Sequence, residues 1–130
     1  MKNKILLTLL FVVFSLGMMA QNSIITQWKE LNNYDALLKK TYRLAEVGDL
    51  KPIRANAEVL VDFAHDITDE TLSVRYNKLK NNDKLKLVVQ QTEELQQAIK
   101  KKEKNEELFK RFTKLRNDYK KFIREIEIKD

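Results

Sequence analysis

The chain has 130 residues and no cysteine, and its 25 Lys and Arg against 19 Asp and Glu give a formal net charge of +6. The absence of cysteine excludes disulfides, thiolate metal sites and lipid attachment through a cysteine, so packing alone must stabilise the fold. In a cytoplasmic protein this charge would favour nucleic-acid binding, but the first segment of the chain argues against that compartment.

That first segment has the build of a secretory signal peptide. Lys2 and Lys4 precede an uncharged, mostly apolar run from Ile5 to the small residue Ala20, and polar residues follow. A basic segment, an apolar segment and a small residue before the cleavage point are the parts of such a peptide. The run is shorter than the roughly 20 residues that span a bilayer, which disfavours the alternative of a retained anchor. We therefore expect a signal peptide over residues 1–20, a single domain over 21–130 without a membrane-spanning helix, and export to the periplasm or beyond, away from nucleic acid.

The exported part is expected to form four helices. The first runs from about Ser23 to Val47, and Gly48 suits the left-handed position just after a helix. The second begins near Pro52, which is tolerated in a first turn, and ends near Asp66. A longer connection then covers 68–82. The third helix, capped by Asn82 or Asp83, extends to about Lys101, and the fourth begins with Asn105 as a cap.

Each of these segments carries an apolar stripe with spacings of three and four, which is typical of an amphipathic helix. Short links join the first helix to the second and the third to the fourth, so the sequence predicts an all-α, up-down-up-down four-helix bundle. The alternative is an extended helical hairpin whose last two helices form a coiled coil with a partner. The stripes are Trp28, Leu31, Leu38, Tyr42 and Ala45; Ile53, Ala57, Leu60, Ala64 and Ile67; Leu85, Val88, Thr92, Leu95 and Ile99; and Leu108, Phe112, Leu115, Tyr119, Phe122 and Ile126.

Asp35 stands where the first stripe should carry an apolar residue. If the first and last helices are antiparallel neighbours, Asp35 and Arg116 both lie roughly 17 Å from the turn end, at 1.5 Å rise per residue. An arginine opposite a buried aspartate would offset the cost of burying its charge. The alternative is a rotated first helix, with Tyr34 in the core and Asp35 at a solvated boundary. The candidate central polar layer consists of Asp35, Arg116, Thr92, His65, Tyr34 and Tyr119.

The sequence offers no set of residues for catalysis or for holding a cofactor. A zinc site needs three or four His, Cys or acidic ligands, whereas His65 is the only histidine. Haem-binding bundles need axial His or Met, and all three methionines lie before Gln21. A di-iron bundle needs Glu-x-x-His on two helices, and neither occurs here. We therefore expect no enzyme, no metal and no cofactor.

Two segments, WKELNNYDALLKKTYRLAEVGDLKPIRANAEVL and LFKRFTKLRNDYKKFI, resemble a group of small exported bacterial four-helix-bundle proteins. That resemblance implies aromatic-His pairs on the first helix and a Leu-His-Asp-x-Phe-His motif on the last. The histidines, which would suggest transition-metal binding in the relatives, are replaced here, so the metal is not carried over. The resemblance instead implies an ion pair in the place of that metal. The aromatic positions match Tyr34, Tyr42 and Tyr119, the turn matches Gly48 to Ile53, and the histidine positions fall on Asp35, Arg43, Arg116 and Lys120.

Taken together, these observations predict an exported, non-catalytic helical-bundle protein that acts as a binding or accessory module for a small ligand or a protein partner. One alternative is a metal-binding bundle that uses Asp35 and His65. Another is an oligomeric coiled-coil scaffold for a protein partner. A rise in melting temperature with zinc or copper would support the first alternative, and light scattering would identify the second.

Overall fold

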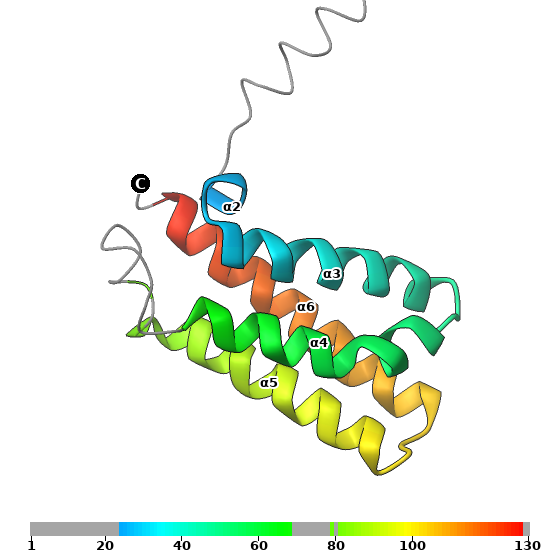
Figure 1. Ribbon diagram of the computed structural model, residues 1–130. Coiled ribbons are helices and arrows are strands. Elements are labelled where there is room, and N and C mark those ends of the chain that lie inside the picture. Colours follow the sequence, from blue (N-terminus) through cyan, green and yellow to red (C-terminus); the bar gives the residue numbers. More distant parts are fainter. Residues whose placement is uncertain (1–23, 69–78, 80, 129–130) are drawn as a thin grey trace, which may run out of the picture.

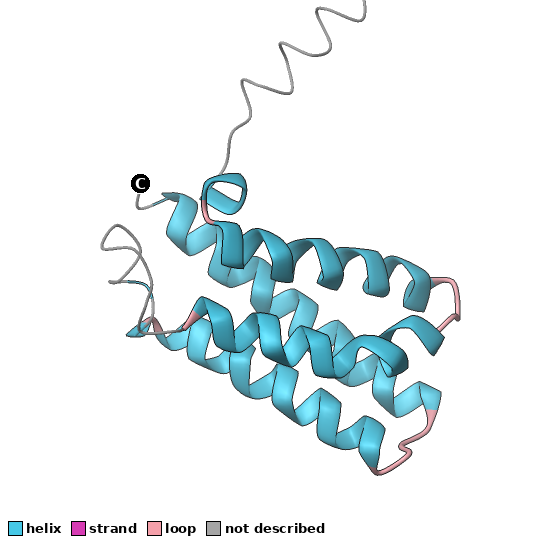
Figure 2. Ribbon diagram, viewed as in Figure 1, coloured by secondary structure: helices cyan, strands magenta, loops and turns pink. Residues whose placement is uncertain are grey.

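The computed structural model describes residues 24–68, 79 and 81–128, and this part of the chain is all-α (Figure 2). The predicted signal peptide, residues 1–20, and most of the connection over 68–82 lie outside the described residues. Within them, no helix is both long enough and apolar enough to cross a membrane. The helices are α2 (Ile24–Gln27), α3 (Lys29–Glu46), α4 (Lys51–Ile67), α5 (Asp83–Lys100) and α6 (Asn105–Ile128).

The four long helices pack in chain order. Helix α3 lies along α4, α4 along α5, and α5 along α6, while the backbones of α3 and α6 approach each other at fewer points (Figure 1). Apolar stripes on all four meet between the helices, as the spacing of three and four requires. The predicted stripe residues are buried except Ile99, which is partly buried and packs against the core, while its neighbour Ala98 is fully covered.

The predicted first helix is divided at Trp28. The backbone there is extended, with φ −109° and ψ 100°, so α2 turns away from the axis of α3 at one end of the molecule (Figure 1). The side chain of Trp28 is buried in the core. Burial of the large indole stabilises the fold by more than is lost when one residue leaves the helical conformation. This difference accounts for the break at Trp28. A single helix from Ser23 to Val47 was therefore the wrong expectation.

The other helix ends follow the predicted signals, with one exception. Asn82 caps α5 through its side-chain oxygen, which accepts from the backbone N–H groups of Lys84 and Leu85. Asn105, in contrast, is the first residue of α6 and not its cap. Its side-chain oxygen accepts from Arg54 Nη2 at 2.8 Å, and the same nitrogen donates to the Glu103 carbonyl at 2.7 Å. Arg54 thereby joins the start of α4 to the α5–α6 turn, at the end of the molecule that also holds the α3–α4 turn (Figure 1).

The two short turns share one backbone design. After α3, the N–H of Gly48 bonds to the carbonyl of Ala45 and that of Asp49 to Leu44. After α5, Lys102 and Glu103 bond in the same pattern to Ile99 and Ala98. This pairing is the Schellman motif, which places its first residue past the helix cap in the left-handed region. Gly48 has φ 91° and Lys102 has φ 57°.

Substitutions at these equivalent positions are expected to change stability in opposite directions. Gly48→Ala should lower the free energy of unfolding by about 1 kcal/mol, because a Cβ disfavours the left-handed region. No atom lies within 4 Å of the position that this Cβ would take, so the cost comes from the backbone alone. Lys102→Gly should raise the free energy of unfolding by about 0.5–1 kcal/mol, because it removes a Cβ from a residue in the left-handed region. Urea denaturation of both variants measures this, and a loss of stability in Lys102→Gly would contradict the strain at that residue.

Candidate functional site

The buried carboxylate of Asp35 has a partner for each of its oxygens. Asp35 is only 6% exposed. The hydroxyl of Tyr119 on α6 donates to Asp35 Oδ1 at 2.7 Å, and Nζ of Lys39, one turn further along α3, lies 3.0 Å from Oδ2. Lys39 itself is mostly exposed. Asp35 therefore lies at the border of the core, where one oxygen is bonded inside and the other reaches a surface ammonium group.

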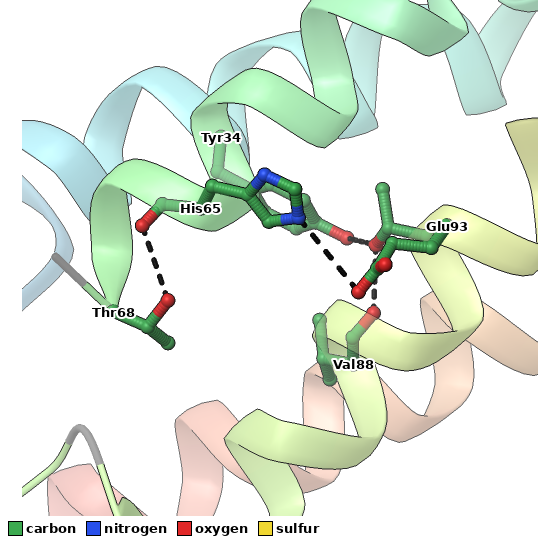
Figure 3. Close-up of polar contacts among 6 residues, drawn as sticks. Tyr34, His65, Thr68, Val88 and Glu93 are labelled. Atoms are coloured by element: carbon green, nitrogen blue, oxygen red, sulfur yellow. Dashed lines mark hydrogen bonds and ion pairs between the residues drawn. The ribbon is translucent and has the colours of Figure 1, made fainter.

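A second hydroxyl pair lies beside this contact. Tyr34 Oη and Thr92 Oγ1 are 2.8 Å apart, and the Thr92 hydroxyl donates to the Val88 carbonyl at 2.7 Å. Because the single proton of Thr92 is used in that bond, the hydroxyl of Tyr34 is the donor to Thr92. Figure 3 shows Tyr34 reaching from α3 toward α5 beside Val88. The rings of Tyr34 and Tyr119 pack with their centroids 5.3 Å apart, so the layer is continuous across α3, α5 and α6.

Both tyrosine hydroxyls are held in the protonated state. Burial raises the pKa of Tyr34 well above its ordinary value, and the hydrogen bond with Thr92 offsets only part of this shift. Burial also raises the pKa of Tyr119, and the negative charge of Asp35 and the hydrogen bond to it raise it further. A phenolate at either position would be both desolvated and, at Tyr119, repelled by a carboxylate. The two groups consequently act as hydrogen-bond donors across the neutral pH range.

The predicted ion pair between Asp35 and Arg116 is not formed. The Cζ atom of Arg116 lies 4.8 Å from the centroid of the Tyr42 ring, and Nη1 donates to Asn117 Oδ1 at 3.1 Å. Arg116 follows the core residue Leu115, so it lies at the edge of the buried face of α6, where a guanidinium can cover an aromatic ring and keep its water. Tyr119, one turn further on, takes the place beside Asp35.

His65 also lies outside the layer. Its Nε2 is 3.7 Å from Oε1 of Glu93, and the two side chains are 54% and 52% exposed (Figure 3). The neighbouring Ala64 takes the core position of α4. Of the six predicted residues, the structure brings together Asp35, Tyr119, Tyr34 and Thr92 and places Arg116 and His65 elsewhere. The described part of the chain holds no group of three or more His, Cys, Asp or Glu side chains that could ligate a metal ion.

A second polar cluster, which the sequence analysis missed, lies in the seam between α5 and α6. A hollow of about 90 Å³ adjoins a groove of about 360 Å³, because Glu94 and Arg111 line both. Gln91 of α5 is one of the residues that line the hollow, and its Nε2 donates to Asp118 Oδ2 of α6 at 2.8 Å. The sequence signal was a glutamine three residues after Val88 and four before Leu95, a position at the edge of the buried stripe.

Searches with this chain against models of protein families, curated proteins and solved structures find no match.

Proposed function

We propose that this protein is an exported, non-catalytic four-helix bundle with up-down-up-down topology that serves as a binding or accessory module outside the cytoplasm. Its signal peptide is residues 1–20, and its compartment is the periplasm or the extracellular space. The chemistry of the polar layer and the composition of the first 20 residues support this proposal.

The proposal that this protein is not an enzyme rests on the hydrogen bonds within the polar layer. Catalytic groups have to face a substrate, with a base or nucleophile in reach of the reacting atoms. In the layer, the hydroxyl protons of Tyr119, Tyr34 and Thr92 are all used in bonds to other protein groups. A buried polar network of this kind sets the rotation and height of packed helices relative to one another. We therefore assign the layer a structural role and place the binding role on the surface of the bundle.

Export and the bundle can be tested on the full chain. Expression in a bacterium, followed by fractionation and intact-mass measurement, should yield a periplasmic or secreted protein that begins at Gln21. An Ala20→Arg variant, which removes the small residue before the cleavage point, should keep the leader attached. Recovery of the unmodified chain in the cytoplasm, with Met1 to Ala20 still attached, would overturn the assignment to an exported protein.

The purified protein should be monomeric at micromolar concentration by light scattering, and millimolar zinc or copper should leave its melting temperature unchanged. A ligand that binds the folded state alone raises the melting temperature by mass action. A rise with either metal would favour the alternative of a metal-binding bundle, and a stable oligomer would favour the alternative of a coiled-coil scaffold.

A further inference from the structure

We propose that the α5–α6 turn, residues 100–104, is an electrostatic docking surface by which this protein binds a bilayer that contains anionic phospholipids. The inference deepens the proposed function, because it names the partner of the binding module, and it rests on that function for the compartment. Three observations support it: four lysines without ion pairs in five consecutive residues, two of these lysines at positions that cost stability, and an exposed apolar side chain at the same end of the molecule.

The turn carries a positive charge that no side-chain contact within the described part of the chain neutralises. Four of its five residues are lysines, and all four are exposed. None of the four ammonium groups forms a hydrogen bond or an ion pair with another described residue. The nearest acids along the chain have other partners. Arg111 Nε lies 2.8 Å from Glu103 Oε1, and Lys110 Nζ lies within 4.0 Å of both Glu106 and Glu107. The four lysines are Lys100, Lys101, Lys102 and Lys104.

Lys102 occupies a position at which glycine would stabilise the fold. Its φ of 57° lies in the left-handed region, where a side chain is unfavourable, and Gly48 fills the equivalent position of the α3–α4 turn. Backbone strain of this kind is concentrated at functional positions. Glycine would relieve the strain but would bring no charge, so the ammonium group explains the lysine better than folding does.

Lys104 occupies a second unfavourable position. Its carbonyl accepts from the N–H of Leu108 at 2.9 Å, so it is the N-cap residue of α6. A lysine side chain has no acceptor for the free N–H groups of the first turn, and its charge lies beside the positive end of the helix dipole. Lys100 and Lys101, in contrast, lie at the end of α5, where cations are favourable. Two of the four lysines therefore lower the stability of the turn, which indicates a role for their charge outside the fold.

The composition of this surface favours a bilayer over a nucleic acid. All four charges are ammonium groups on flexible stems, which suit a surface of many mobile phosphates, whereas recognition of individual phosphates and bases favours arginine. Residues 100–104 include no aromatic ring on which a base could stack. The proposed export also brings the chain to the outer face of a membrane and away from nucleic acid.

Val47 provides the apolar side chain at this end. It lies in the α3–α4 turn, beside the α5–α6 turn at the same end of the bundle, and it is 79% exposed (Figure 1). An apolar side chain gains free energy when it enters the headgroup region of a bilayer. Glu46 and Asp49 belong to the same turn, so the α3–α4 turn adds apolar contact and little attraction. The attraction comes from the four lysines.

The test is sedimentation of the purified chain with vesicles of two compositions, phosphatidylcholine alone and an equimolar mixture with phosphatidylglycerol. The protein should bind the mixed vesicles saturably and the neutral vesicles at least about tenfold more weakly. Binding to the mixed vesicles should weaken as salt is raised from about 0.1 M to about 1 M, because the screening length falls from about 10 Å to about 3 Å. Tighter binding to a double-stranded DNA oligonucleotide than to the mixed vesicles would overturn the proposal in favour of a nucleic-acid surface.

Two triple variants with the same loss of charge locate the surface. Lys100→Gln, Lys101→Gln and Lys104→Gln together should weaken binding to the mixed vesicles about 100-fold, since each lysine near an anionic membrane contributes a factor of about five. The control triple replaces by glutamine three exposed lysines in the first turns of α3 and α5 and in the second half of α6, and it should weaken binding less than about fivefold. The control residues are Lys29, Lys86 and Lys120.

Lys102→Gly separates a role in binding from a role in folding. It should raise the urea midpoint of unfolding, because it relieves the left-handed strain, and at the same time weaken binding to the mixed vesicles about fivefold. A residue that serves the fold alone would not weaken binding while it raised stability. Wild-type affinity in Lys102→Gly, or equal losses in the two triple variants, would overturn the docking surface.

Export is measured separately, in cells, by the mass of the processed chain. A cleaved, exported protein that does not prefer anionic vesicles would contradict the docking surface alone, whereas a retained leader in the cytoplasm would contradict the proposed function. The comparison of the two triple variants tests the turn in either case, because both variants carry the same start of the chain.

Discussion

Alkaline pH is expected to unfold this protein through its two buried tyrosines. In the unfolded chain a tyrosine loses its proton near pH 10, whereas burial raises the pKa of Tyr34 and Tyr119 in the folded state well above that value. The folded state then binds more protons than the unfolded state above pH 10, so stability is fully present below that pH and is lost as the pH rises. Two such groups give a limiting slope of about 2.7 kcal/mol per pH unit.

The measurement is a series of urea denaturations between pH 8 and 12, followed by circular dichroism. The Tyr34→Phe variant, which keeps Tyr119, should show about half the slope, near 1.4 kcal/mol per pH unit. Lysine deprotonation occurs in the same range, but it contributes equally to the wild-type protein and to the variant. If removal of both tyrosine hydroxyls left the alkaline loss of stability unchanged, the two buried phenols could not be its cause.

Replacing Tyr119 with phenylalanine should lower the free energy of unfolding by about 1.5–3 kcal/mol, the range for a hydrogen bond to a charged group. The change removes the donor from Asp35 Oδ1 and leaves Lys39 as its partner at the surface. Phenylalanine keeps the ring that packs against Tyr34, so the loss reports the hydroxyl and not the core volume. Chemical denaturation at neutral pH provides the measurement.

Tyr42→Phe is the matched control. It removes the same hydroxyl from a tyrosine whose partner is the neutral Thr113 Oγ1, at 3.0 Å, so the expected loss is only about 0.5–1.5 kcal/mol. A double-mutant cycle of Tyr119→Phe with Asp35→Ala should show a coupling between these residues, within the range of about 0.5–3 kcal/mol for residues in contact. Additive effects of the two substitutions, or equal losses for Tyr119→Phe and Tyr42→Phe, would contradict this prediction. They would show that the hydrogen bond to the carboxylate stabilises the fold no more than a hydrogen bond to a neutral group.

Both predictions depend on the same feature, a layer of polar groups that form hydrogen bonds with one another and with other protein groups. Such a layer stabilises one arrangement of helices against others with a different rotation, because any rotation leaves Asp35, Tyr34 or Thr92 without its partner. This explains how a chain without disulfides, with two alanines in the core stripe of α4, can still specify a single packing.

The residues of the layer were predictable from the sequence only in part. Asp35 was recognisable because an acid interrupts an apolar stripe, and Thr92 because it stands within the stripe of α5. Both criteria depend on one residue and its own helix. The prediction of Arg116 as the partner of Asp35 was wrong, because a count of rise per residue gives the height of a side chain and not its direction around the helix. Arg116 and Tyr119 differ by one turn, and only Tyr119 lies on the buried stripe.

The sequence by itself determined the helical class, the buried face of each helix and most helix ends, because periodicity and capping act within one segment of chain. Only the tertiary structure decided that α2 breaks from α3 at Trp28, that Arg54 holds the α5–α6 turn, that Lys102 adopts a left-handed backbone and that Gln91 donates to Asp118. The physical reason is that each of these features joins residues far apart in the chain or balances local strain against packing. Such balances exist only once the helices have been brought together.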